Sequence, residues 1–123
     1  VLTESSGAVT PLVGWGGLEW REAARAGAVG VQPGCSLTEL YVEAQKHLDQ
    51  GDDTAFDTVF EPLRGPLEVW MRHPEVLIAV EKHILQRRGV IDSPYCRHPS
   101  ADLSTADLEH ADRMIHRVTG QAA

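Results

Sequence analysis

The stretch Gly27-Ala28-Val29-Gly30-Val31 is short and apolar, and Pro33-Gly34 follows it closely. An apolar run of this length, bounded by residues that break regular structure, is typical of a strand buried on both faces. Upstream, the apolar residues 9–13 predict another strand, and a helical pattern from Leu18 to Ala26 lies between the two. A strand, about ten residues of helix and a second strand form the rhythm of a parallel sheet. The sequence therefore predicts an α/β fold with two neighbouring parallel strands.

A helix should follow the second of these strands. Residues 36–39, Ser-Leu-Thr-Glu, have the pattern of a capping box, in which the Ser hydroxyl accepts a bond from the Glu amide and the Glu side chain reaches back. Apolar residues at helical spacing continue to Leu48, and Gly51 ends the pattern.

The rest of the chain has helical patterns and no further strand pattern. Asp52 or Asp53 should cap a segment that runs to Leu63, where Gly65-Pro66 interrupts it before a continuation from Leu67 to Met71. The remaining two helices are defined by their terminal residues: Pro74 and Gly89 for one, and Ser104 or Thr105 and Gly120 for the other.

Two parallel strands do not form a self-sufficient sheet, because their edges and faces need further strands and helices. The sequence also begins at Val1 and not at a methionine. We therefore expect further N-terminal material, which a (β/α)₈ barrel with a helical extension would supply. Residues 1–50 would then be the last two β/α units, strands seven and eight with their helices. Residues 51–123 would be a three-helix C-terminal extension, and the isolated chain would be mostly helical.

The composition disfavours several classes of partner. The formal net charge is −7, with 18 acidic against 11 basic residues, so neither nucleic acid nor an anionic membrane is an expected partner. No apolar run approaches the roughly 20 residues of a membrane-spanning helix. Cys35 and Cys96 lie far apart in the sequence, which favours a reduced, cytoplasmic setting.

Several motifs, in order along the chain, resemble those of the dihydrodipicolinate synthase and N-acetylneuraminate lyase family. Residues 27–31 resemble the family's eighth strand, "G-A-x-G-V", and Gln50-Gly51-Asp52 with Ala55 resembles the "G-D-x-x-x-A" after the eighth helix. Residues 14–17 and 33–35 resemble a subset with "G-x-G-G" and "P-G-C". Four weaker likenesses lie in the tail, at Glu61-Pro62-Leu63, Lys82, Arg88-Gly89-Val90 and Arg97-His98-Pro99.

The resemblance implies a lyase of the class I aldolase type that uses Schiff-base chemistry. In that family a lysine amine attacks the ketone of pyruvate or a related 2-oxo acid, and the iminium serves as an electron sink for aldol chemistry or dehydration. A tyrosine relays protons, and no cofactor is expected. The family's lysine lies on the sixth strand and its tyrosine near the end of the fifth, so both are expected upstream of Val1.

One motif tests that register. Glu4-Ser5-Ser6-Gly7 resembles the "K-E-S-S-G" that holds the family's lysine, with Thr3 in the lysine's place. Only six residues separate Gly7 from Gly14, too few for the sixth helix, so we expect Val1–Gly7 to be the end of helix six. In either register the nucleophile is absent, and this chain alone is expected to be inactive.

Five residues are candidate substrate contacts at the carboxyl ends of the two strands. Gly14, Trp15 and Gly16 form the turn from strand to helix, where backbone amides can hold an anion and where a barrel has its active site. By resemblance, Gln32 approaches the bound 2-oxo acid, and Pro33 closes the strand beside it. The alternatives are a plain tight turn and, because the family usually has an apolar residue at the position of Gln32, no polar contact there.

Other chemistries lack a consistent pattern. A dinucleotide fingerprint would need glycine where Glu19 stands. His83, Cys96 and His98 come nearest to a metal site, but they have no ligand spacing, so no bound metal is expected. Lys82 falls on a predicted tail helix, where we expect a surface or salt-bridge role.

Two other interpretations stay open. The chain could be a free-standing, mostly helical module that oligomerises or binds a partner through exposed apolar surface, without catalysis. It could also be a piece cleaved from a longer protein. For a parent enzyme we expect a small 2-oxo acid such as pyruvate as the substrate, and a homo-oligomer. The sequence leaves open the actual substrate, the reaction subtype and the oligomeric state.

Overall fold

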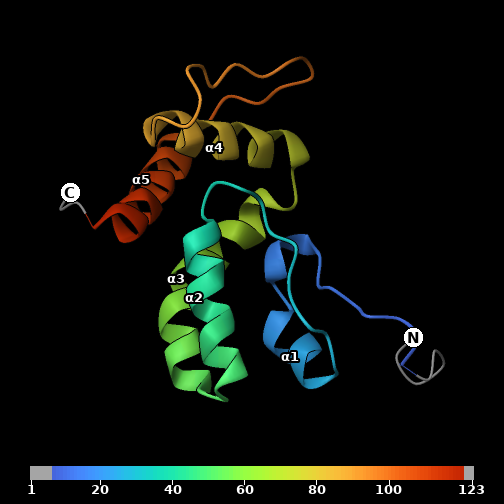
Figure 1. The fold of residues 1–123 in the computed structure, drawn as a ribbon. Coiled ribbons are helices and arrows are strands. Elements are labelled where there is room, and N and C mark those ends of the chain that lie inside the picture. The colour runs from blue at the N-terminus through green and yellow to red at the C-terminus, as the bar shows by residue number, and fades with distance from the viewer. Residues whose placement is uncertain (1–6, 121–123) are drawn as a thin grey trace.

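The structure is a computed structural model that describes residues 7–120, and 60% of these residues are helical. In Figure 1, α2 and α3 lie side by side, α1 flanks them near the N-terminus, and α4 and α5 cross at the other end. The expected end of helix six at Val1–Gly7 lies outside the described residues except for Gly7. The described elements are η1 (Trp15–Gly17), α1 (Trp20–Arg25), α2 (Thr38–Asp49), α3 (Asp53–Trp70), α4 (Pro74–Arg87) and α5 (Thr105–Thr119).

The two predicted strands are only partly formed. Residues 7–120 contain one parallel bridge, between Val13 and Val31, and no longer strand. The Val13 amide donates to the Gly30 carbonyl (2.9 Å), and the Gln32 amide donates to the Val13 carbonyl (2.7 Å). The next bond, from the Val29 amide to the Pro11 carbonyl, is one residue out of that register, and Pro11 has no N–H with which to continue a ladder. The predicted parallel direction is therefore correct, but the prediction of two full strands is wrong for these residues.

The predicted capping box at the start of α2 is also wrong. Helix α2 begins at Thr38, and no side chain caps it. The Glu39 carboxylate instead pairs with Arg88 of α4, and the Ser36 hydroxyl is fully buried. An arginine 49 positions away has taken the acidic partner that the box would need.

Helix α3 runs unbroken through Gly65-Pro66, where the sequence predicted an interruption. Pro62 and Pro66 both lie inside it, and a proline removes the N–H that would bond the carbonyl four residues earlier. Arg117 of α5 compensates for Pro62, because its guanidinium donates to the free Thr58 carbonyl at 3.1 Å. This bond satisfies the backbone at Pro62, and at Gly65-Pro66 the helix continues with Pro66 buried.

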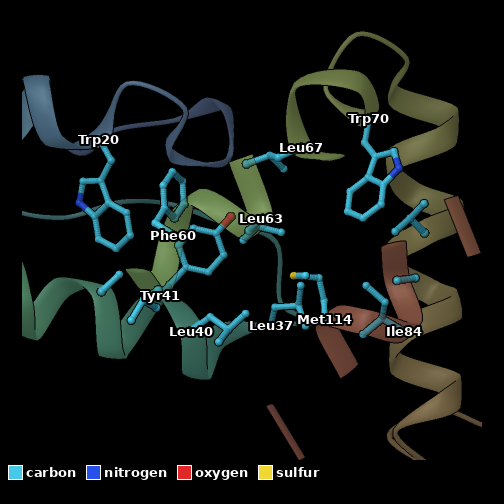
Figure 2. Close-up of a cluster of buried hydrophobic side chains, with 14 of the residues drawn as sticks. Trp20, Leu37, Leu40, Tyr41, Phe60, Leu63, Leu67, Trp70, Ile84 and Met114 are labelled. Atoms are coloured by element: carbon cyan, nitrogen blue, oxygen red, sulfur yellow. The ribbon is translucent and has the colours of Figure 1, made fainter. Parts of the chain in front are cut away.

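An aromatic cluster joins α1, α2 and α3 (Figure 2). Trp20 stacks on Tyr41 with 5.6 Å between the ring centroids, and it meets Phe56 and Phe60 edge-on at 5.5 and 5.7 Å. All four side chains are buried, and aromatic pairs of this geometry contribute about 0.5–1.5 kcal/mol each beyond the area they bury. The core is therefore continuous across Gly51, the boundary of the two predicted domains, and that division remains a prediction.

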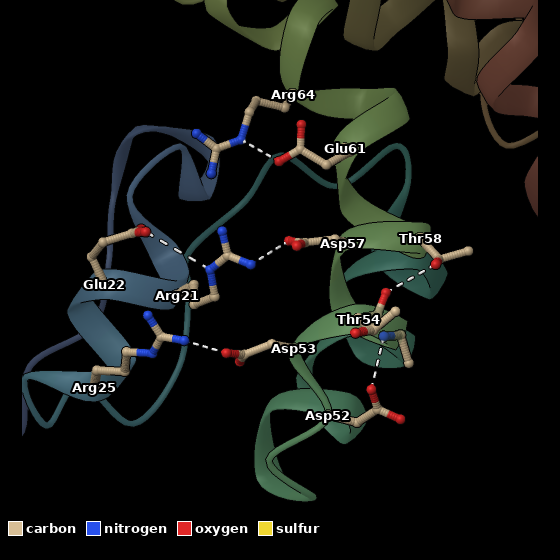
Figure 3. A network of polar contacts seen from close by, with 11 residues as sticks. Arg21, Glu22, Arg25, Asp52, Asp53, Thr54, Asp57, Thr58, Glu61 and Arg64 are labelled. Carbon is tan, nitrogen blue, oxygen red and sulfur yellow. Dashed lines mark hydrogen bonds and ion pairs between the residues drawn. The ribbon is translucent and has the colours of Figure 1, made fainter.

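Two ion pairs orient α1 on α3 (Figure 3). Arg21 bonds Asp57 at 2.5 Å, and Arg25 pairs with Asp53 one turn earlier on α3. The hydrogen bond to Asp57 is the main reason that the pKa of Arg21 is raised above its usual value. Because both pairs are partly open to solvent, we assign them orientation more than stability.

A second part of the core joins α3 to the tail helices. Trp70 at the end of α3 is buried, and its indole N–H donates to Asp107 at 2.8 Å. Helix α5 starts where the sequence predicted, with Ser104 as its N-cap, and Asp107 completes a capping box with Ser104. None of the described helices is both long and apolar enough to cross a lipid bilayer.

Candidate functional site

The turn after Val13 has an uncommon backbone. Trp15, Gly16 and Gly17 follow one another with φ of +50°, +60° and +83°, all in the left-handed region. Glycine adopts this region freely, but a bulky residue such as Trp15 does so at a cost of roughly 1–2 kcal/mol. The indole is nevertheless 67% exposed, so core packing does not explain the strained conformation.

Both glycines of the turn are required by close approach. A Cβ on Gly16 would lie 2.8 Å from the Leu67 side chain, and one on Gly17 would lie 2.9 Å from Val31. The Tyr41 hydroxyl donates to the Gly16 carbonyl at 2.8 Å from inside the core. The turn is thus fixed against α3, α2 and the residue that pairs with Val13.

Gly14 and Trp15 line an open pocket of about 510 Å³ together with Val13, Leu18 and Glu19. Its wall is mostly apolar, and the Glu19 carboxylate is its acidic group. Two amides of the turn are already engaged, because Gly17 donates to the Gly14 carbonyl and Leu18 to the Trp15 carbonyl. The pocket therefore offers an aromatic and apolar surface more than an array of free amides.

The parallel bridge brings the other two candidates to the same edge. Because Val13 pairs with Val31, Gly14 and Gln32 both follow the pairing at its carboxyl end. The Gln32 side chain is exposed and Pro33 is half-buried, and neither lines the pocket beside Trp15. The structure thus groups Gly14, Trp15 and Gly16 closely, with Gln32 and Pro33 as neighbours across the bridge.

Helix α4 holds the loop that follows Pro33. The Glu81 carboxylate accepts from the Ser36 amide at 3.0 Å, and it leaves no room for a Cβ on Gly34. Arg88 donates to the Ser36 carbonyl and pairs with Glu39. The hydrogen bond from Arg88 is the main reason that the pKa of Glu39 is lowered below its usual value. Sequence reasoning missed Glu81, Arg88 and Tyr41 in these roles, because each acts across 25 or more positions that no local pattern connects.

Neither lysine of the sequence lines the pocket beside Trp15. Lys46 is exposed on α2, and Lys82 of α4 donates its ammonium to the Tyr95 carbonyl at 2.7 Å. His83, Cys96 and His98 lie along a separate hollow between α4 and the loop before α5. Among residues 7–120, no three His, Cys, Asp or Glu side chains come together in a way that could hold a metal ion.

The fold is thus a mostly helical chain whose aromatic core carries one short parallel pairing, with the candidate residues at its carboxyl edge. No protein-family model and no curated protein matches the sequence. Among solved structures the chain is similar to dihydrodipicolinate synthase from Rhodopseudomonas palustris, with a TM-score of 0.75 and 24% sequence identity. The match covers 94% of this chain and 39% of that one, so the chain spans well under half the length of this neighbour. At this identity the likeness shows a shared fold.

Proposed function

We propose that this chain is the C-terminal part of a Schiff-base-forming lyase of the dihydrodipicolinate synthase type. Residues 1–50 would form the last two β/α units of its (β/α)₈ barrel, and residues 51–123 a helical extension. The parent protein would act on pyruvate or another small 2-oxo acid, without a cofactor, and would be a cytoplasmic homo-oligomer.

One observation carries the proposal: 94% of the chain superposes on 39% of a dihydrodipicolinate synthase with a TM-score of 0.75. The parallel bridge between Val13 and Val31 agrees with it, because neighbouring barrel strands are parallel. The motif resemblances add to it, since they occur in the family's order.

In this proposal the chain contributes the wall of the substrate site and not the nucleophile. Gly14, Trp15 and Gly16 would face the substrate from the turn after strand seven, and Gln32 and Pro33 from the end of strand eight. The parent's lysine amine would add to the ketone of the 2-oxo acid and expel water to form the imine. Lys46 and Lys82 are poor candidates for that role, because neither lines the pocket beside Trp15, and the Lys82 ammonium donates to the Tyr95 carbonyl.

Borohydride trapping with pyruvate tests the proposal. Borohydride reduces an imine to a stable amine, so the parent should gain the mass of a pyruvate adduct on a lysine outside residues 1–123. Under the same conditions the chain alone should keep its mass. An adduct mapped by peptide mass spectrometry to Lys46 or Lys82, or a parent that forms no adduct, would contradict the proposal.

A second candidate function has its own observation. Val9, Leu12 and Val29 expose large apolar side chains around the incomplete pairing near the N-terminus. Such a patch favours an oligomerisation or partner-binding module that performs no catalysis. If the parent forms no imine but the chain associates reversibly through these residues, this second function is favoured.

A further inference from the structure

We infer that Tyr41 is the positioning residue of the Trp15 turn: its buried hydroxyl holds Trp15-Gly16-Gly17 in the left-handed form that presents the indole at the pocket. The inference rests on the proposed substrate-facing role of this turn. It assigns a function to a side chain on α2 that lies 25 positions from the carbonyl it binds.

The positive φ of Trp15 has to be stabilised by contacts with the rest of the protein. Its φ of +50° is unfavourable for a large side chain, and its exposed indole gains little contact in return. Without a restraint, this residue would relax to the ordinary right-handed or extended region. The restraint must therefore act on the backbone of the turn.

Tyr41 supplies that restraint directly. Its hydroxyl donates to the carbonyl of Gly16, the residue that follows Trp15, at 2.8 Å. The ring cannot swing away, because it is stacked on Trp20 and meets Phe60 edge-on at 5.9 Å. Burial, with a smaller contribution from the nearby Glu81 charge, raises the pKa of Tyr41, so the phenol remains a donor at ordinary pH. Leu67 and Val31 close the turn from the other sides.

The exposures of the three tryptophans make the turn observable. Trp20 and Trp70 are 1% and 2% exposed, whereas Trp15 is 67% exposed. Acrylamide should therefore quench mainly the Trp15 emission, and Trp15→Phe identifies that component. The nuclear Overhauser cross-peak between the amide and Hα hydrogens of Trp15 reports φ independently. It is strong at positive φ, because the two hydrogens are closest there.

Tyr41→Phe removes the hydroxyl and keeps the ring. In the full chain we expect it to weaken the Trp15 amide-to-Hα cross-peak and change the quenching of that indole, while Trp20 and Trp70 stay shielded. A Tyr41→Phe chain with an intact core and an unchanged Trp15 cross-peak would overturn the inference.

A thermodynamic cycle keeps the test decisive if Tyr41→Phe lowers stability. In the wild type, Tyr41→Phe loses the hydrogen bond but lets the turn relax and release the backbone penalty at Trp15. In the Trp15→Gly background there is no such penalty to release. Tyr41→Phe should therefore lower the unfolding midpoint less in the wild type than in the Trp15→Gly background. An equal loss in both backgrounds would mean that the hydroxyl supports only the core.

The parent enzyme separates this inference from the proposed function. There, Tyr41→Phe should raise KM for the 2-oxo acid several-fold and leave kcat nearly unchanged. If the cross-peak weakens but KM does not change, Tyr41 holds the turn as inferred, and the substrate-facing role of the turn is wrong.

Discussion

Val31 and Gln32 are neighbours in the chain but have different surroundings. The Val31 side chain is half-buried, packs on the core and closes over Gly17. The Gln32 side chain is exposed, and only its backbone amide takes part in the pairing with Val13. Side chains alternate in direction along an extended segment, so one faces the protein while the next faces away from it.

This difference predicts opposite effects of two substitutions. Val31→Ala should lower the free energy of unfolding by about 1–2 kcal/mol, because it removes packed methyl groups. Gln32→Ala should change it by less than about 0.5 kcal/mol, as for other exposed positions, and should alter KM of the parent enzyme. Chemical denaturation and steady-state kinetics measure the two effects. A large loss of stability in Gln32→Ala with unchanged kinetics would mean that the register is off by one residue.

The Asp107 carboxylate bonds both the start of α5 and the end of α3. It accepts from the Ser104 hydroxyl at 2.6 Å and amide at 2.9 Å, and from the Trp70 indole at 2.8 Å. The Ser104 bonds are the first cause of its lowered pKa, and the Trp70 bond adds to them.

A lowered pKa in the folded state gives a definite pH dependence. Its contribution to stability is complete above the unfolded pKa of about 4, and it is lost as the pH falls through the lower folded value. Asp107→Asn should therefore melt below the wild type at pH 7, and the difference should shrink as the pH approaches about 3. Thermal melts at several pH values test this, with Asp102→Asn as the matched control. A difference that stays constant with pH would contradict it.

At the scale of elements, the sequence predicts what local chemistry determines. The start of α3 at Asp52, of α4 at Pro74 and of α5 at Ser104 were predictable, because the caps or first-turn residues act within a few positions. The bond that satisfies α3 at Pro62 and the uncapped start of α2 were not, because they depend on Arg117 and Arg88 from distant helices.

The candidate site divides in the same way. Glycines and a tryptophan after an apolar run marked the turn. Nothing local to the turn indicated that Tyr41 binds it.

Pro62 in α3 gives a testable coupling between helices. Pro62→Ala should raise the free energy of unfolding by about 1–2 kcal/mol. Alanine supplies the N–H that the Thr58 carbonyl would accept in a regular helix, and it has a higher helix propensity than proline. Arg117→Ala should cost about 1 kcal/mol in the wild type and less in the Pro62→Ala background. Arg113→Ala, on the same helix, is the control and should show no such coupling. Equal costs of Arg117→Ala in both backgrounds would mean that the Thr58 carbonyl does not need this donor.

At the scale of the molecule, two regions contrast. The aromatic core and the tail contact bury their large side chains, whereas the segment around the Val13–Val31 bridge exposes Val9, Leu12 and Val29. A single pairing leaves the outer edges of both segments open. We therefore expect this region to pack against further protein, either the rest of a parent barrel or another copy of the chain.

Association through this region should depend on its apolar side chains. The wild-type chain should self-associate at micromolar concentration in sedimentation experiments, and Leu12→Glu should shift it towards the monomer without lowering the unfolding midpoint. Val42→Glu, at an exposed apolar position on α2, is the matched control and should leave association unchanged. A compact monomeric wild type with a sharp thermal transition would contradict the expectation.

The bond between Arg117 and the Thr58 carbonyl also sets an order in time. The two residues are 59 positions apart, and a ribosome adding about 5–20 residues per second needs roughly 3–12 s to pass from one to the other. Throughout that interval the Thr58 carbonyl, which Pro62 leaves without an N–H donor, lacks its bond to Arg117. The helix that forms the centre of the core therefore gains this bond only after residue 117 has been synthesised.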